Sequence, residues 1–133
     1  MLAITSKAPY AVLALAELAR RGSEQPVPIG ELARSRDIPV QFLEGLFATL
    51  RRAGVLQSQR GVKGGYLFAR PPAEVTVLEV VELLEGELGT EAADSGAVWV
   101  DATEAVKGVL RSTTIADVVE REARARAQPM YYI

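Results

Sequence analysis

The residues best suited to bind another molecule lie in the glycine-rich segment Arg60-Gly61-Val62-Lys63-Gly64-Gly65. Arginine and lysine bind phosphate oxygens, and glycine allows a sharp turn and a close backbone approach. Short apolar runs flank the segment, so we predict a β-hairpin with strands Val55–Gln59 and Tyr66–Ala69 and a positively charged tip. Such a tip suits the minor groove of DNA; in an ordinary hairpin the glycines would serve only the turn.

The chain has 133 residues and no cysteine or histidine. This composition excludes disulfides, cysteine-bound iron–sulfur clusters, the usual zinc ligands and the commonest general base. Carboxylates alone can bind Mg²⁺ or Ca²⁺, but the sequence has no run of spaced acidic residues like that of a calcium-binding loop. We therefore expect no metal, no cofactor and no enzymatic activity.

The composition is that of a folded protein, since 49% of the residues are hydrophobic. The length suits one domain, with or without an extension for oligomerisation. No apolar stretch is long enough to span a membrane, and the first residues lack the pattern of an export signal. We expect a cytoplasmic protein.

Charge is divided unevenly along the chain, although the net charge is only −2. Residues 1–71 contain ten Lys and Arg against five Asp and Glu, whereas residues 72–133 contain five against twelve. A basic half is typical of a protein that binds nucleic acid, and the acidic half should face away from DNA. Because charge fluctuates along any chain, the asymmetry acquires meaning only from the elements that carry it.

Capping residues and apolar periodicity predict six helices around the hairpin. Their expected bounds are Lys7–Arg21, Ile29–Ser35, Pro39–Ala53, Val77–Leu84, Ala97–Arg111 and Ile115–Ala127. Thr5 or Ser6 can cap the first helix, and capping boxes at Thr76-x-x-Glu79 and Thr114-x-x-Asp117 open the fourth and the last. Residues Gly86–Gly96 are polar and glycine-bearing, so we expect a mobile loop there. We expect a short extended piece at Val27–Ile29.

Three short helices followed by a basic hairpin form a winged helix-turn-helix, whose usual partner is DNA. The predicted fold is mainly α with a small β-hairpin wing, followed by C-terminal helices. The third helix is the expected recognition helix, and its buried stripe consists of Leu43, Leu46, Phe47 and Leu50.

The opposite face of the third helix can contact bases in the major groove. Gln41 can bind adenine through two hydrogen bonds, Glu44 can accept from cytosine N4, and Phe42 can contact a thymine methyl group. The alternatives are solvated side chains at Gln41 and Glu44 and a core position for Phe42. Candidates for phosphate contacts or for plain solvated surface near helix ends are Lys7, Arg51 and Arg52.

The fifth helix carries an apolar stripe that a winged fold does not need for its own core. The stripe consists of Trp99, Ala102, Val106, Val109 and Leu110. A tryptophan stripe usually packs inside its own chain, but here the preceding fold is already complete, so we predict a homodimer through this helix. Two-fold symmetry predicts a pseudo-palindromic DNA site with half-sites about 34–36 Å, or a multiple, apart.

Taken together, these segments resemble one family of bacterial regulators, the IscR/NsrR/CymR (Rrf-two) transcription regulators. The matching runs are Thr5-Ser6-Lys7-x-x-Tyr10-Ala11-Val12, Phe42-Leu43-Glu44-x-Leu46-Phe47-x-x-Leu50-Arg51-x-Ala53-Gly54, Ser58-x-Arg60-Gly61-x-x-Gly64-Gly65-Tyr66, Ala69-Arg70-Pro71 and Thr113-Thr114-Ile115-Ala116-Asp117-Val118. They span nearly the whole chain, and their order is more specific than any single run.

The resemblance implies a DNA-binding homodimer in which a long helix crosses between protomers. It implies major-groove contacts at Gln41, Phe42, Glu44 and Gly45, a minor-groove contact at Arg60, and a sensor in the fifth helix and the loop before it. The chain then divides into a DNA-binding region (1–72), a fourth helix with a sensor-type loop (73–96), and a dimerisation helix with a C-terminal helix (97–133).

This chain also departs from the family pattern at several positions. It lacks the three cysteines of the cluster-binding members, so it resembles a cluster-free member. Gly45 stands where family members commonly have a long polar residue. Pro9 stands where they commonly have a basic residue, and Lys63 in the wing can restore the positive charge lost there.

We predict a transcription repressor that binds a pseudo-palindromic operator as a homodimer. Its signal would be a small molecule, a partner enzyme or its own abundance. The alternative is a protein-interaction module that kept the winged fold and lost specific DNA binding, with the apolar tail Pro129–Ile133 as a docking peptide.

Overall fold

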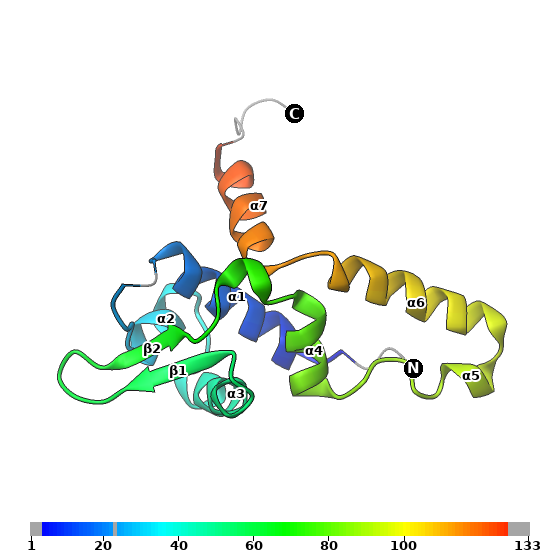
Figure 1. Ribbon diagram of the computed structural model, residues 1–133, viewed down its shortest axis with the longest axis horizontal. Coiled ribbons are helices and arrows are strands. Elements are labelled where there is room, and N and C mark those ends of the chain that lie inside the picture. Colours follow the sequence, from blue (N-terminus) through cyan, green and yellow to red (C-terminus); the bar gives the residue numbers. More distant parts are fainter. Residues whose placement is uncertain (1–3, 23, 128–133) are drawn as a thin grey trace.

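The computed structural model describes residues 4–22 and 24–127, so the tail at 129–133 lies outside the described residues. The helices of this part are α1 (Lys7–Arg20), α2 (Ile29–Ser35), α3 (Val40–Arg52), α4 (Val77–Glu85), α5 (Ala92–Ser95), α6 (Ala97–Arg111) and α7 (Ile115–Ala127), with a 3₁₀ turn η1 at Pro72–Glu74. The strands β1 (Leu56–Gln59) and β2 (Gly65–Phe68) form a hairpin. Figure 1 shows the hairpin tip and the α5–α6 arm at opposite ends of the long axis.

One apolar core lies between α1, α2, α3, α4 and the hairpin. The predicted stripe of α3 is part of it, with Leu43, Leu46, Phe47 and Leu50 at most 5% exposed. Burial of each such side chain contributes roughly 1.5–3 kcal/mol, so the stripe fixes the rotation of α3. The opposite face, which carries Gln41 and Glu44, is therefore held toward solvent.

The hairpin is anchored to the helices by a third extended segment. Val27 and Tyr66 exchange two backbone hydrogen bonds of 3.0 and 2.9 Å, which confirms the short extended piece predicted before α2. Gly65 has a φ of +151°, and a Cβ atom on it would lie 2.3 Å from the backbone of Val27. Glycine is thus required where the hairpin passes this segment.

The helix bounds follow the sequence prediction to within one residue. Helix α1 ends at Arg20 instead of Arg21, α3 ends at Arg52 instead of Ala53, and α4 extends to Glu85 instead of Leu84. Helix α3 begins at Val40 because Pro39 has extended backbone angles and serves as the N-cap. The expected loop at 86–96 contains the four-residue helix α5, and Leu88 and Ala92 bury their side chains against the rest of the chain. Strand β1 begins one residue later than predicted, at Leu56, and β2 is shifted by one residue toward the hairpin tip, to Gly65–Phe68.

The two predicted capping boxes form to different extents. At α7, the Thr114 hydroxyl accepts from the Asp117 amide (3.1 Å), and the Asp117 carboxylate accepts from the Thr114 amide (2.9 Å). These bonds lower the pKa of Asp117. At α4, Thr76 caps the amide of Glu79, but the Glu79 carboxylate instead accepts from Arg70 (2.5 Å).

A buried ion-pair network joins elements that are distant in sequence. Glu17 of α1 is 3% exposed and accepts from Arg20, Arg21 and Arg36. Arg36, in the turn between α2 and α3, also donates two 2.8 Å hydrogen bonds to Glu122 of α7. Burial alone would raise the pKa of Glu17, but the hydrogen bonds from the three arginines outweigh it and lower the pKa to about 2.

Helix α6 is anchored at its C-terminal end and projects from the core (Figure 1). Val77 and Ile115 donate backbone hydrogen bonds to Thr113 and Val75, which tie the α6–α7 connection to the segment before α4. Within α6, which is described throughout, Thr103 alone is buried. No helix in the described ranges is long and apolar enough to cross a membrane.

Candidate DNA-binding surface

The outer face of α3 presents three of the residues predicted to contact bases. Gln41, Glu44 and Gly45 are exposed, because the buried stripe occupies the other side of the helix. A Cβ atom on Gly45 would meet no described residue within 4 Å beyond its neighbours in the helix. The face is therefore open to a partner and has a gap at Gly45.

Phe42 is half-buried, so one part of its ring lies in the core and another part faces the outer surface of α3. Its ring packs edge-to-face against Tyr10 of α1, with ring centroids 5.7 Å apart. The same residue lines a groove together with Gln41 and Gly45. Its position is thus fixed by the core, and one part of the ring remains accessible from the outer face.

This groove extends the surface beyond the residues expected from sequence. Lys7 of α1 lies on its wall beside Gln41 and Gly45. The remaining wall comes from Thr49 of α3 and from Leu83 and Leu84 of α4. Since α4 is separated from α3 by the whole hairpin and the 3₁₀ turn, neither leucine could be assigned to this surface from spacing.

The start of α1 is held by a residue that sequence analysis missed. The carboxylate of Glu85, at the end of α4, accepts from the Thr5 amide (2.9 Å), the Thr5 hydroxyl (2.8 Å) and the Ala8 amide (3.2 Å). Among the described residues, Ser6 makes no side-chain cap for α1. Thr5 does provide a predicted local contact, because its hydroxyl accepts from the Lys7 amide at 3.2 Å. Glu85 adds acceptors for Thr5 and Ala8 and so helps to fix the turn that carries Lys7.

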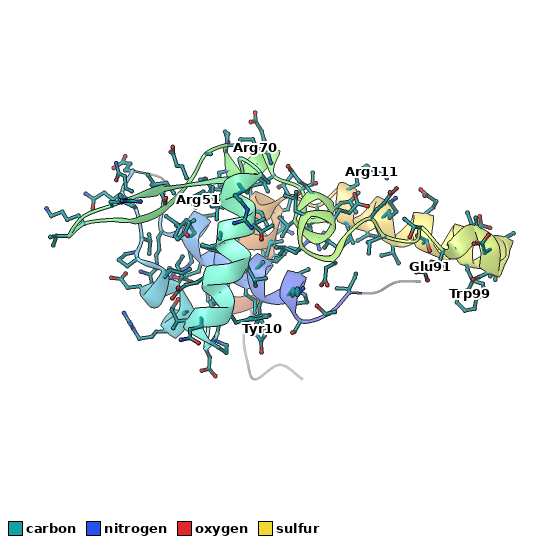
Figure 2. The ribbon with its side chains drawn as sticks, turned by 90° about the horizontal axis from the view of Figure 1, so that it is seen from below. Tyr10, Arg51, Arg70, Glu91, Trp99 and Arg111 are labelled. Atoms are coloured by element: carbon teal, nitrogen blue, oxygen red, sulfur yellow. The ribbon has the colours of Figure 1, made fainter. Side chains whose placement is uncertain are left out.

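Helix α3 ends in two arginines, of which Arg51 lies next to the hairpin (Figure 2). Arg51 donates to the hydroxyl of Ser58 on β1 at 3.4 Å, and Arg52 donates to Thr49 at 3.3 Å. Both side chains remain exposed. The charge of Arg51 thus lies between α3 and the hairpin, and that of Arg52 lies on the exposed end of α3.

The wing tip projects into solvent, with Arg60, Gly61, Val62 and Lys63 all exposed. A Cβ atom on Gly64 would lie 2.3 Å from the carbonyl oxygen of Gln59, so the tip is folded tightly on itself. The Gly64 amide donates to the Gly61 carbonyl at 3.0 Å and closes the turn. The two predicted cations are thereby displayed on a compact loop.

The predicted dimer stripe on α6 divides into two parts. Trp99 and Val109 are exposed, at 47% and 61%, and Ala102 and Val106 are half-buried. Leu110 instead packs against the core of its own chain, because the end of α6 is anchored there. Figure 2 places Trp99 on the arm far from Arg51 and the wing. Val98, which is also exposed, was missed in the predicted stripe.

The described residues contain no group of three or more His, Cys, Asp or Glu side chains placed to hold a metal ion.

Comparison with known families identifies what kind of protein carries this surface. Residues 4–121 match the Rrf2 family, described as iron-dependent transcriptional regulators. The chain belongs to the Rrf2 family. It is a DNA-binding transcription regulator with a winged-helix fold, as the sequence resemblance predicted, and its relatives are named as regulators and not as enzymes.

Named relatives match over most of their length. The transcriptional regulator IscR of Serratia proteamaculans is 31% identical over 131 residues, covering 90% of this chain and 80% of that protein. CymR of Bacillus subtilis is 30% identical, covering 98% and 99%.

Solved structures of the same regulators have the same fold. The structure of CymR (YrzC), the global cysteine regulator of B. subtilis, has a TM-score of 0.81 and 32% identity, covering 91% of this chain and 98% of that one. T. potens IscR has a TM-score of 0.82 and 34% identity, covering 99% and 97%. These matches confirm the predicted fold class of helices with a hairpin wing.

Proposed function

We propose that this Rrf2 protein is a repressor that binds a pseudo-palindromic operator as a homodimer and works without an iron–sulfur cluster. The observation that carries the proposal is the joint exposure of the α3 face and the cationic wing on one rigid fold. The absence of cysteine removes the usual cluster ligands. A dimer bound across a promoter would exclude the polymerase.

Gln41 and Glu44 would read bases in the major groove, where an amide pairs with adenine and a carboxylate accepts from cytosine. Phe42 would contribute its accessible edge to a thymine methyl group. Gly45 would let the DNA approach the helix closely. Arg60 and Lys63 would enter the minor groove, with Gly61, Gly64 and Gly65 shaping the loop that holds them.

Lys7, Arg51 and Arg52 would bind phosphates and fix the register of the protein on the duplex. Their support is position, since all three are exposed and flank the α3 face. On this account residues 1–72 form the DNA-binding region. Residues 73–96 would comprise α4 and a sensor-type loop, and residues 97–133 the dimerisation helix α6 followed by the C-terminal helix.

The dimer would form through the exposed side of α6, because Val98, Trp99 and Val109 remain largely exposed within the described part of the chain. A second copy would bury these apolar side chains in a two-fold symmetric interface. The two recognition helices would then lie about one DNA turn, or a multiple, apart.

A second candidate is a module that binds protein instead of specific DNA. The gap at Gly45 favours it, because one potential base contact is missing from the α3 face. Competition between duplex DNA and captured protein partners separates the two candidates.

Selection of binding sequences from a random duplex pool at physiological salt tests the proposal. We expect a palindrome from the chain alone, recovered equally by Arg124→Ala, a control that removes an exposed charge on α7. Failure to enrich any sequence, with the chain alone and again with small metabolites added, would contradict the proposal.

A further inference from the structure

A small pocket lies between the segment 87–93 and α6. Its volume is about 180 Å³, which leaves room for one small molecule and is less than a drug-sized ligand requires. Leu88 and Gly89 line one side, and Val100, Thr103 and Lys107 of α6 line the other. The approach is close, since a Cβ atom on Gly89 would lie 2.1 Å from Thr103.

The hydroxyl of Thr103 has no hydrogen-bond partner among the described residues, although the residue is only 4% exposed. Threonines and serines in helices usually donate to a carbonyl of the preceding turn. Thr113 does so, with a 2.8 Å bond to the Val109 carbonyl. Among the described residues, only Arg70 Nε is a fully buried side-chain polar atom without a partner, so the Thr103 hydroxyl is open to the pocket that it lines and is available to a ligand there.

Lys107 lies one turn after Thr103, and its side chain is 14% exposed. The nearest carboxylate oxygen, Oε2 of Glu82, is 3.8 Å from its ammonium nitrogen, which is too far for a hydrogen bond. That oxygen already accepts from the Leu88 amide at 3.2 Å. Lys107 is thus ion-paired with Glu82 without a hydrogen bond, and within the described part of the chain its N–H donors can turn to a ligand.

These two donors stand on one face of α6, four residues apart, and can both bind a carboxylate. The other ionisable residues on the wall, Glu87 and Glu104, are acidic. These two carboxylates disfavour a simple anion but can pair with an ammonium group. A ligand that carries a carboxylate and an ammonium group close together can therefore pair with both the donors on α6 and the two glutamates.

We infer that this pocket binds a free α-amino acid, with its carboxylate on Thr103 and Lys107 and its ammonium group toward Glu87 and Glu104. The site is built from side chains that the DNA-binding surface does not use, so it stands independently of DNA binding. Its role as an effector site rests on the proposed function.

The pocket lies beside the element that positions the DNA-binding surface. Lys107 faces Glu82, and Glu85 follows one turn later on α4, where it holds Thr5 and Ala8 of α1. A ligand carboxylate that draws Lys107 away from Glu82 would change the ion pairing of α4 one turn before Glu85, the residue that holds the start of α1. By thermodynamic reciprocity, any change in DNA affinity must equal the change that DNA causes in ligand affinity.

Titration calorimetry and thermal unfolding of the full chain without DNA test the site, using the common L-amino acids singly. We expect at least one to bind and to raise the unfolding temperature. Its analogues that lack either the amino or the carboxyl group should bind about tenfold more weakly or not at all, because each loses a charged contact. Lys107→Met should weaken binding about tenfold and Thr103→Val about fivefold. Arg111→Met, which removes an exposed charge at the end of the same helix, should leave binding unchanged.

Absence of binding by every amino acid would overturn the inference. Equal binding of the carboxylate-only analogue would overturn the assignment to amino acids. Unchanged affinity in both Lys107→Met and Thr103→Val, with each variant folded by circular dichroism, would place the ligand elsewhere. Because DNA is absent, these outcomes do not depend on whether the chain binds an operator.

Discussion

Helices α3 and α6 are both amphipathic, but their apolar faces have different surroundings. On α3, Leu43, Leu46 and Leu50 are enclosed by the core of the same chain, whereas on α6 Trp99 and Val109 face outward. The difference shows that periodicity alone identifies an apolar face and does not identify its partner. For α3 the partner is the chain itself, and for α6 we propose a second copy.

The two regions also differ in the ion pairs that connect them to other elements. The proposed DNA-binding region is joined to α7 by the network of Glu17, Arg36 and Glu122, which is partly or fully buried. Trp99, by contrast, lies on the α5–α6 arm, far from Tyr10 of α1 (Figure 2). The first region is thus rigid within one chain, while the arm is suited to contacts outside it.

The largest expected effect is on the stability of the DNA-binding region. Glu17→Gln leaves three arginines around a neutral amide, and we expect the free energy of unfolding to fall by about 3 kcal/mol. Urea unfolding at neutral pH measures this change. Glu120→Gln, which breaks an exposed ion pair with Arg124, is the matched control and should cost no more than about 0.5 kcal/mol.

The pH dependence of unfolding tests whether the charge of the Glu17 carboxylate causes this stabilisation. Since the pKa of Glu17 is lowered from 4.5 to about 2, its contribution is present above pH 4.5 and is lost as the pH falls toward 2. The wild-type chain should therefore lose more stability over this interval than Glu17→Gln. Parallel curves would show that the carboxylate does not stabilise the fold.

The arm is tested by Trp99→Asp, which places a charge on the face that we assign to the dimer. We expect monomers in sedimentation, unchanged urea unfolding of the winged fold, and about 100-fold weaker operator binding through loss of bivalency. A dimer that persists would place the interface elsewhere. Glu120→Gln is again a suitable control, because it lies outside the proposed interface.

The wing is tested by Arg60→Ala. Loss of one charged minor-groove contact should weaken operator binding about tenfold at physiological salt and lower the salt dependence of binding. Fluorescence anisotropy with the selected duplex measures both. The exposed control Arg124→Ala removes the same charge from α7, and an equal effect of the two substitutions would refute a specific role for the wing.

The smallest change in affinity is expected from Glu44→Ala. Loss of the carboxylate should relax the preference at one base pair while total affinity changes by less than about threefold, because one mismatch penalty of 1–3 kcal/mol disappears. Repeating the sequence selection with the variant measures the preference. An unchanged preferred sequence would remove Glu44 from the set of base-reading residues.

Features encoded by neighbouring residues were predictable from the sequence. The bounds of α2, α6 and α7 and the stripe on α3 follow from caps and from apolar spacing, which are local properties. The short helix α5 has too few residues for such a pattern and depends on burial of Ala92.

Features that depend on distant residues were not predictable in this way. Glu85 holds Thr5 across 80 positions, and Arg36 reaches Glu122 across 86. Leu83 and Leu84 join the groove beside Gln41 only after α4 packs next to α3. These contacts depend on how whole helices pack, so they cannot be predicted from the spacing of residues within one helix.

Chemical footprinting of both grooves, on a duplex recovered by the selection, tests the central claim most directly. We predict two protected major-groove segments about 34–36 Å, or a multiple, apart, each flanked by a protected minor groove, as expected for two copies of α3 and its wing. Arg60→Ala should lose only the minor-groove protection. A single protected segment, or protection that ignores the grooves, would contradict a dimer that reads DNA through α3 and the wing.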